Sequence, residues 1–97
     1  MSPAEATALI QEIAQDSSKI FVTHHANVQI RKRDISRLDV ERCLRNGFIT
    51  EGPIENVAKQ NWEATVEAQI AGEMVAVVAA IKENPDDRII VVTAYVR

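Results

Sequence analysis

Two short stretches of the sequence carry side chains that could do acid–base and phosphate chemistry. One combines an imidazole, an amide and two cations, on His25, Gln29, Lys32 and Arg33. The other alternates with apolar residues near the end of the chain and comprises Thr93, Tyr95 and Arg97. An imidazole transfers protons near neutral pH, cations hold a phosphodiester, and a tyrosine ring stacks on a base. These groups would suffice to cleave RNA without a metal, with a base activating the 2′-hydroxyl and an acid protonating the leaving oxygen.

Each of these residues also has an ordinary structural interpretation. A histidine at the start of a helix often caps it, and a tyrosine near the end of a sheet usually packs there with a wet hydroxyl. Arg97 is the last residue and can fray. The residues alone leave both interpretations open.

Other kinds of site are not expected. His24 and His25 are adjacent, so they point to different sides of a helix and cannot both face one metal. The three glycines stand at turns and form no phosphate-binding loop. The single cysteine, Cys43, is expected in the core. The sequence therefore predicts no metal and no cofactor.

Composition and charge favour one small domain of 97 residues, with 46% hydrophobic and 26% charged residues. The net charge is −3, yet residues 24–50 carry six bases against three acids. This basic segment is either a local anion site or the wet surface of two helices. The lone cysteine, the absence of a long apolar stretch and an N-terminus without a basic signal-peptide region predict a cytoplasmic protein.

Helices are expected first. Ser2 and Glu5 form a capping box for a helix within residues 1–18, and residues 19–23 form a short strand. A second helix follows over HHANVQIRKR, with Ala26 and Ile30 on one side and the polar candidates beside them. Ser36 and Asp39 cap a third helix, which Gly47 is expected to end in the left-handed conformation, with Phe48 folding back onto Cys43.

Strands are expected after residue 48. Trp62 to Ile70 alternate between a core face and a wet face, Ala71-Gly72 is a hairpin turn, and residues 83–87 form another turn. Apolar runs at 74–81 and 89–96 suggest the central strands, the last placing Thr93, Tyr95 and Arg97 on the face of Ile89 and Val91. The prediction is an α+β domain over 1–97, with a curved antiparallel sheet of three or four strands after the helices.

The stretch VTHHANVQIRKRDISRLDVERCLRNGFI resembles the start of the domain-of-unknown-function 4258 family. Members typically show Thr-x-His-Ala, an Arg-rich helix ending in Arg-x-Ile, and then Gly-x-Ile. The matching positions here are Thr23, His25-Ala26, Arg33 with Ile35, and Gly47 with Ile49. The ending VVTAYVR is similar to the family's last strand. The resemblance covers roughly residues 19–97 and leaves the first helix, within residues 1–18, as an addition.

That family is distantly similar to the RelE and BrnT ribonuclease toxins. The resemblance implies a RelE-like fold with an RNA site between the basic helices and the sheet, where His25, Arg33 and Tyr95 are catalytic. The candidates for RNA contact are Lys32, Arg31, Thr93, Arg97 and Gln29. Family members often have arginine where this chain has Gln29, and Arg31 lies about 200° round the helix from it.

Two main hypotheses remain open. The first is a metal-independent, toxin-like endoribonuclease of a toxin–antitoxin system, active or inactivated. The second is a non-catalytic protein-binding domain that keeps the same fold, which the acidic balance and Gln29 favour. A small-molecule or metal role is a third, less supported by the residues. The candidate partners are an antitoxin protein, RNA and a second copy of the chain, and no membrane partner is expected.

Overall fold

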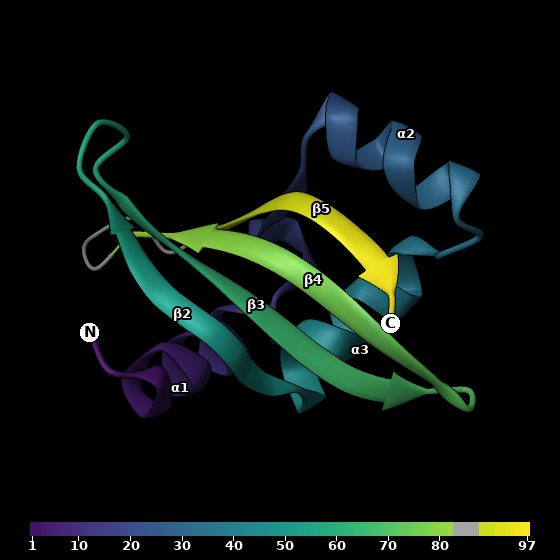
Figure 1. Cartoon of the computed structure of the whole chain (residues 1–97), viewed down its shortest axis with the longest axis horizontal. Helices are drawn as coiled ribbons and strands as arrows, with labels where there is room; N and C mark the ends of the chain where they lie inside the picture. Colours follow the sequence, from purple (N-terminus) through teal and green to yellow (C-terminus); the bar gives the residue numbers. More distant parts are fainter. Residues whose placement is uncertain (83–87) are drawn as a thin grey trace.

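The computed structural model describes residues 1–82 and 88–97, which form three α-helices and one open five-stranded sheet (Figure 1). The elements, in chain order, are α1 (Pro3–Ile13), a 3₁₀ turn (Ser17–Lys19), β1 (Ile20–Val22), α2 (His24–Lys32), α3 (Arg37–Asn46), β2 (Phe48–Asn56), β3 (Asn61–Ile70), β4 (Glu73–Ile81) and β5 (Ile89–Val96). The α+β class predicted from the sequence is confirmed. The turn predicted at 83–87 lies outside the described residues.

The sheet has the order β1-β5-β4-β3-β2. Strands β2 to β5 are antiparallel to their neighbours, as predicted. The short strand β1 adds to the outer edge of β5 in parallel, pairing Ile20 with Ile89 and Val22 with Val91. The hairpin between β3 and β4 turns at Ala71 and Gly72, both at positive φ as a type I′ turn requires.

The helices divide between one face of the sheet and its edge. In Figure 1, α1 and α3 lie together on one face, and α2 lies beside β5. Helix α1 begins at the predicted capping box, in which Ser2 accepts from the Glu5 backbone and Glu5 reaches back to Ser2. Its buried side chains, Ala6, Ile10 and Ile13, belong to the same core cluster as the sheet. The N-terminal helix is therefore part of the one hydrophobic core.

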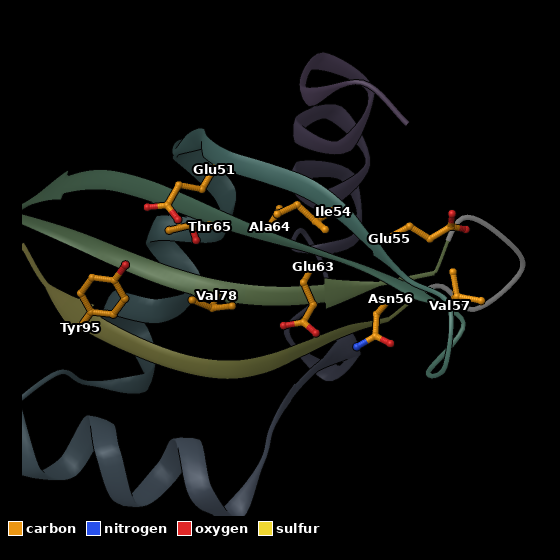
Figure 2. A pocket seen from close by; sticks show the side chains of 10 residues that line it. All are labelled: Glu51, Ile54, Glu55, Asn56, Val57, Glu63, Ala64, Thr65, Val78 and Tyr95. Carbon is orange, nitrogen blue, oxygen red and sulfur yellow. The ribbon is translucent and has the colours of Figure 1, made fainter.

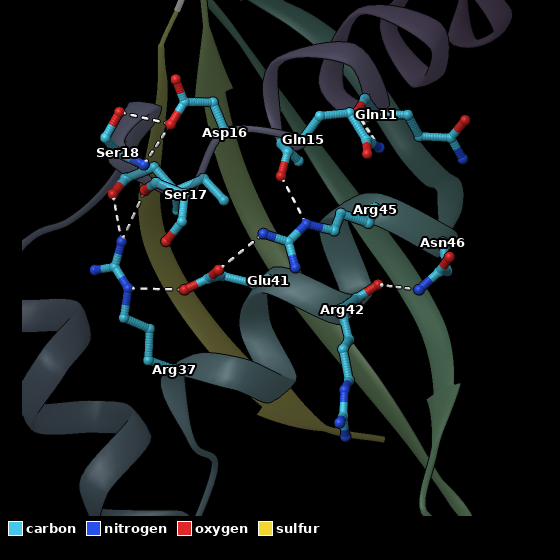
Figure 3. Close-up of polar contacts among 12 residues, drawn as sticks. Gln11, Gln15, Asp16, Ser17, Ser18, Arg37, Glu41, Arg42, Arg45 and Asn46 are labelled. Carbon is cyan, nitrogen blue, oxygen red and sulfur yellow. Dashed lines mark hydrogen bonds and ion pairs between the residues drawn. The ribbon is translucent and has the colours of Figure 1, made fainter.

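Helix α3 is tied to the preceding chain by two of its arginines (Figure 3). The buried carboxylate of Glu41 pairs with Arg37 and Arg45, each at 3.0 Å. Arg37 also donates to the carbonyl oxygen of Ile20 at 2.8 Å, and Arg45 to that of Ala14 at 2.7 Å. These two cations of the basic segment hold α3 against the ends of α1 and β1.

The end of α3 differs from the prediction. Gly47 is extended, with φ −84° and ψ 179°, and is not left-handed. Glycine is needed there because a Cβ would lie 2.5 Å from the carbonyl oxygen of Glu67 and 2.6 Å from that of Cys43. Phe48 is 61% exposed and does not fold onto Cys43. The buried thiol instead donates to the carbonyl oxygens of Val66 (3.3 Å) and Val75 (3.5 Å).

The face of the sheet opposite α1 and α3 also departs from the prediction. Thr65 and Glu67, expected in water, are buried. On β5 the register shifts by one residue, since Val78 pairs with Thr93 but Ala79 pairs with Val91. This bulge reverses the alternation, so Thr93, Tyr95 and Arg97 do not share the face of Ile89 and Val91 as predicted.

No helix among residues 1–82 and 88–97 is both long enough and apolar enough to span a membrane.

Candidate functional site

Helix α2 carries the predicted histidine and is anchored at both ends. At its start Thr23 accepts a hydrogen bond from the backbone N–H of Ala26, and its hydroxyl donates to the carbonyl oxygen of Val91 on β5. Ala26 and Ile30 are buried against the core, as the spacing predicted. The threonine therefore caps the helix and also fixes it beside the last strand.

The outward side of α2 is polar. His25, Arg31 and Lys32 are exposed and Gln29 is partly exposed. None of these four side chains makes a hydrogen bond or ion pair with another residue in the described part of the chain. The helix thus offers an imidazole and two cations to solvent, where an anion could approach them.

Arg33 is brought together with Thr93, as the resemblance implied, but by contacts within the protein. Its guanidinium donates to the hydroxyl of Thr93 at 3.3 Å and to the carbonyl oxygen of Ala94 at 2.8 Å. Strand β1 covers the outer edge of β5 only over Ile89–Val91. Arg33 therefore donates to the Ala94 carbonyl, on the part of the β5 edge that β1 does not cover. Part of its hydrogen-bonding capacity is used within the protein.

Tyr95 and Arg97 lie together near the end of β5. The Arg97 guanidinium stands 5.3 Å from the centre of the Tyr95 ring, a cation–π distance. It also pairs with Glu51 at 2.9 Å and with Glu67 at 3.0 Å, and Glu67 accepts a further hydrogen bond from Thr50. A phosphate at Arg97 would have to displace two carboxylates.

The pKa values of this cluster move in the directions that its contacts require. The hydrogen bonds from Arg97 and Thr50 lower the pKa of Glu67 below its ordinary value. The carboxylates of Glu67 and Glu51 raise the pKa of Arg97 above its ordinary value. Both partners are therefore held in their charged forms at neutral pH.

A hollow of about 560 Å³ opens on the sheet face opposite α1 and α3 (Figure 2). We call it the sheet hollow, and its lining includes Glu51, Ile54, Glu55, Glu63, Val78 and Tyr95. Figure 2 shows Glu51 on β2, Glu63 on β3 and Tyr95 on β5 around this one space. No residue of α2 is part of its lining.

The predicted constellation thus falls into two places. His25, Gln29, Arg31 and Lys32 lie on the outward side of α2, and Arg33 connects α2 to Thr93. Tyr95 instead lines the sheet hollow among glutamates, with Arg97 beside it. These glutamates were not among the site residues predicted from the sequence. One sequence signal could have found them. Glu51 precedes the run of alternating residues at 62–70, and Glu63 lies within it, so both could be expected on strands with a solvent-exposed side chain.

Cys43 is not placed for nucleophilic chemistry. Burial, followed by the nearby charge of Glu67, raises the pKa of its thiol to about 12. The thiolate form is therefore scarce at neutral pH. Among residues 1–82 and 88–97, no three His, Cys, Asp or Glu side chains converge as metal ligands would.

Comparison with known proteins places part of the chain in a family. Residues 22–96 match the family model described as "Domain of unknown function (DUF4258)", which begins after α1 and covers well over half of the chain. No protein with curated annotation and no solved structure matches the chain.

Proposed function

This chain belongs to the domain-of-unknown-function 4258 family, and from that premise we propose that it is a non-catalytic protein-binding domain that uses the open face of its sheet. The observation that carries this proposal is the composition of the sheet hollow. Its lining joins three glutamates to exposed apolar side chains and one tyrosine. Apolar groups with an aromatic ring are typical of protein interfaces.

The charges around Tyr95 argue against RNA at the same place. Glu51, Glu55 and Glu63 all line the hollow, and Arg97, which lies against Tyr95, is paired with Glu51 and Glu67. A phosphodiester backbone entering there would meet carboxylates of its own sign, and Arg97 is already held by two of the protein's own carboxylates. Tyr95 is therefore better placed to contact a polypeptide than to assist in cleaving RNA.

A toxin-like, metal-independent endoribonuclease is the second candidate, and the outward side of α2 favours it. His25, Arg31 and Lys32 are exposed there and have no partner among the described residues. In this scheme His25 carries the proton, Lys32 and Arg33 hold the phosphate, and an antitoxin protein covers the basic helix. We rank it second because Tyr95 and Arg97 belong to the acidic hollow and not to this helix.

Crosslinking in the cell distinguishes the two candidates, because it identifies whether protein or RNA contacts each surface. A photo-crosslinking residue in place of Ile54, inside the hollow, is compared with one in place of Leu38 on α3 and one in place of Gln29 on α2. We expect an adduct from position 54 that protease removes and ribonuclease does not, with far less from position 38. A ribonuclease-sensitive adduct from position 29, without a protein adduct from 54, would contradict the proposal.

Growth on induced expression tests catalysis directly. We expect no arrest by the wild type, because Tyr95 lines a hollow whose lining includes glutamates and no residue of α2. Arrest that His25→Ala relieves would instead establish the ribonuclease, provided that the neighbouring exposed histidine variant, His24→Ala, still arrests growth. Cleavage of labelled RNA by the purified protein in the presence of EDTA would establish the same activity in vitro.

We also propose the cytoplasm as its compartment. The free thiol of Cys43 supports this, because reducing compartments keep cysteines unpaired.

A further inference from the structure

We propose that the sheet hollow binds a basic segment of a partner protein, one that presents arginine or lysine together with apolar side chains. This inference rests on the proposed function and adds the chemistry of the partner. It follows from three features of the hollow: its unneutralised carboxylates, its exposed apolar rim and the way in which the protein already holds one of its own arginines there.

The carboxylates of the hollow are only partly neutralised. Glu55 and Glu63 make no ion pair or side-chain hydrogen bond with any residue of the described ranges 1–82 and 88–97. Glu51 has one contact, to Arg97, and its side chain remains 62% exposed. The three glutamates of the lining thus carry more negative charge than Arg97 offsets. A cationic group entering it would gain attraction without displacing an existing ion pair.

Apolar side chains surround the same carboxylates. Ile54 is 69% exposed and Val57 is 77% exposed, and both line the hollow with Val78 beneath. Lysine and arginine carry long apolar stems that end in a charge, so they can cover such residues while the cation reaches a carboxylate. Burying Ile54 and Val57 under those stems would remove apolar surface from water. A small inorganic cation would not bury them.

Arg97 shows how this face holds a guanidinium. It lies 5.3 Å from the centre of the Tyr95 ring, while its Nη2 pairs with both Glu51 and Glu67. The combination of one aromatic ring and flanking carboxylates is a favourable environment for arginine. Glu51 and Tyr95 also line the hollow, and the lining continues past Val78 to Glu63 (Figure 2). We therefore expect a partner's arginine to bind as Arg97 does, between carboxylates and beside apolar or aromatic side chains.

The hollow is large enough for a few side chains of a peptide segment. Its volume of about 560 Å³ lies within the range of pockets that bind small ligands, and it is enough for a few side chains. The exposed Arg31, Lys32 and Arg42 of a second copy could also reach it, but a helix of one copy in the hollow of the next would be a head-to-tail contact. Such contacts form open chains unless the rotation closes a ring, which makes a separate partner the better occupant.

The probe is a fluorescein-labelled peptide of five Arg-Val repeats, titrated with the intact protein and followed by anisotropy. A Glu-Val peptide of equal length and a ten-residue polyuridine are the comparisons. We expect the basic peptide to bind and the other two not to bind. Glu63→Gln and Glu55→Gln should each weaken binding by about three- to tenfold, because each removes one unpaired carboxylate. Glu73→Gln, which removes an exposed carboxylate at the start of β4, is the matched control and should change nothing.

Chemical shifts of the ¹⁵N-labelled protein then locate the bound peptide. Shifts confined to the strands around Tyr95 support the inference. Equal weakening by Glu73→Gln, or no binding of the basic peptide, would overturn it. Binding of the acidic peptide in the hollow would overturn the partner chemistry and leave the protein-binding function intact. Binding of polyuridine along α2, followed by its cleavage, would overturn the proposed function itself. Self-association that Glu63→Gln abolishes would make a second copy the occupant and refute a separate partner.

Discussion

At the scale of single residues, Arg97 decides how the open face of the sheet can be used. It lies against Tyr95 and pairs with Glu51 and with the buried carboxylate of Glu67. The same guanidinium was the predicted phosphate ligand. Because Arg97 is paired with two carboxylates, its role is structural. It offsets only part of the negative charge on this face.

The lowered pKa of Glu67 predicts a pH dependence of stability. Its folded-state pKa lies below its unfolded value of about 4.3, so its contribution is complete above that pH and is lost as pH falls through the folded pKa. Glu67→Gln should lower the free energy of unfolding by about 1–2 kcal/mol at pH 7. It should also flatten the loss of stability below about pH 4.5.

Urea unfolding at a series of pH values measures this effect. Glu73→Gln, at an exposed position at the start of β4, should follow the wild-type curve at every pH. If Glu67→Gln and the wild type lose stability in parallel as the solution is acidified, the folded-state pKa of Glu67 is not below its unfolded value and the prediction is wrong.

At the scale of elements, the junction between α3 and β2 depends on a close backbone approach. A Cβ at Gly47 would lie 2.5 Å and 2.6 Å from two carbonyl oxygens, whereas a Cβ at Gly72 would have nothing within 4 Å. Gly47→Ala should therefore destabilise by about 3 kcal/mol, because backbone must move. Gly72→Ala should cost only about 1 kcal/mol, from its positive φ.

Thermal and chemical unfolding of the two glycine variants provides the comparison. Equal destabilisation would mean that conformational freedom, and not the close approach, is what the junction requires. Loss of α3 packing in Gly47→Ala should also expose Cys43 to a thiol reagent, which the native protein excludes because that thiol is fully buried.

The same elements show what the sequence could predict. The caps at Ser2 and Ser36 depend on residues three positions away, so their signals are local and both were predicted correctly. The conformation of Gly47 depends on a carbonyl oxygen of β3, and its role could not be read locally. The bulge of β5 depends on pairing with β4, and it moved Tyr95 to the face opposite Ile89. For the same reason the glutamates of β2 and β3 could be gathered around Tyr95 only once the strand order was known.

At the scale of the whole molecule, the family match and the core have different boundaries. The match begins at residue 22, yet Ile10 of α1 is 1% exposed within the common core cluster. Ile10→Ala should therefore lower the free energy of unfolding by about 2–5 kcal/mol, as a cavity in any core does. Ile54→Ala, at a position 69% exposed, should change it by less than about 0.5 kcal/mol.

Guanidinium unfolding of these two isoleucine variants tests whether α1 is integral to the fold. A single transition shifted to lower denaturant is expected for Ile10→Ala. An unchanged midpoint would show that residues 22–96 carry their stability without α1. Ile54→Ala should in addition weaken the binding of the basic peptide, because it removes apolar surface from the rim of the hollow.

The parallel pairing of β1 with β5 has a consequence for the chain as it leaves the ribosome. Ile20 pairs with Ile89, 69 residues later, so β1 emerges long before its partner has been translated. Ala26 and Ile30 of helix α2 pack beside β5 in the folded protein, and β5 has not been translated when α2 emerges. A nascent chain stalled before Ile89 therefore cannot form a smaller native domain. Its apolar side chains stay exposed to chaperones and proteases until β5 has been translated.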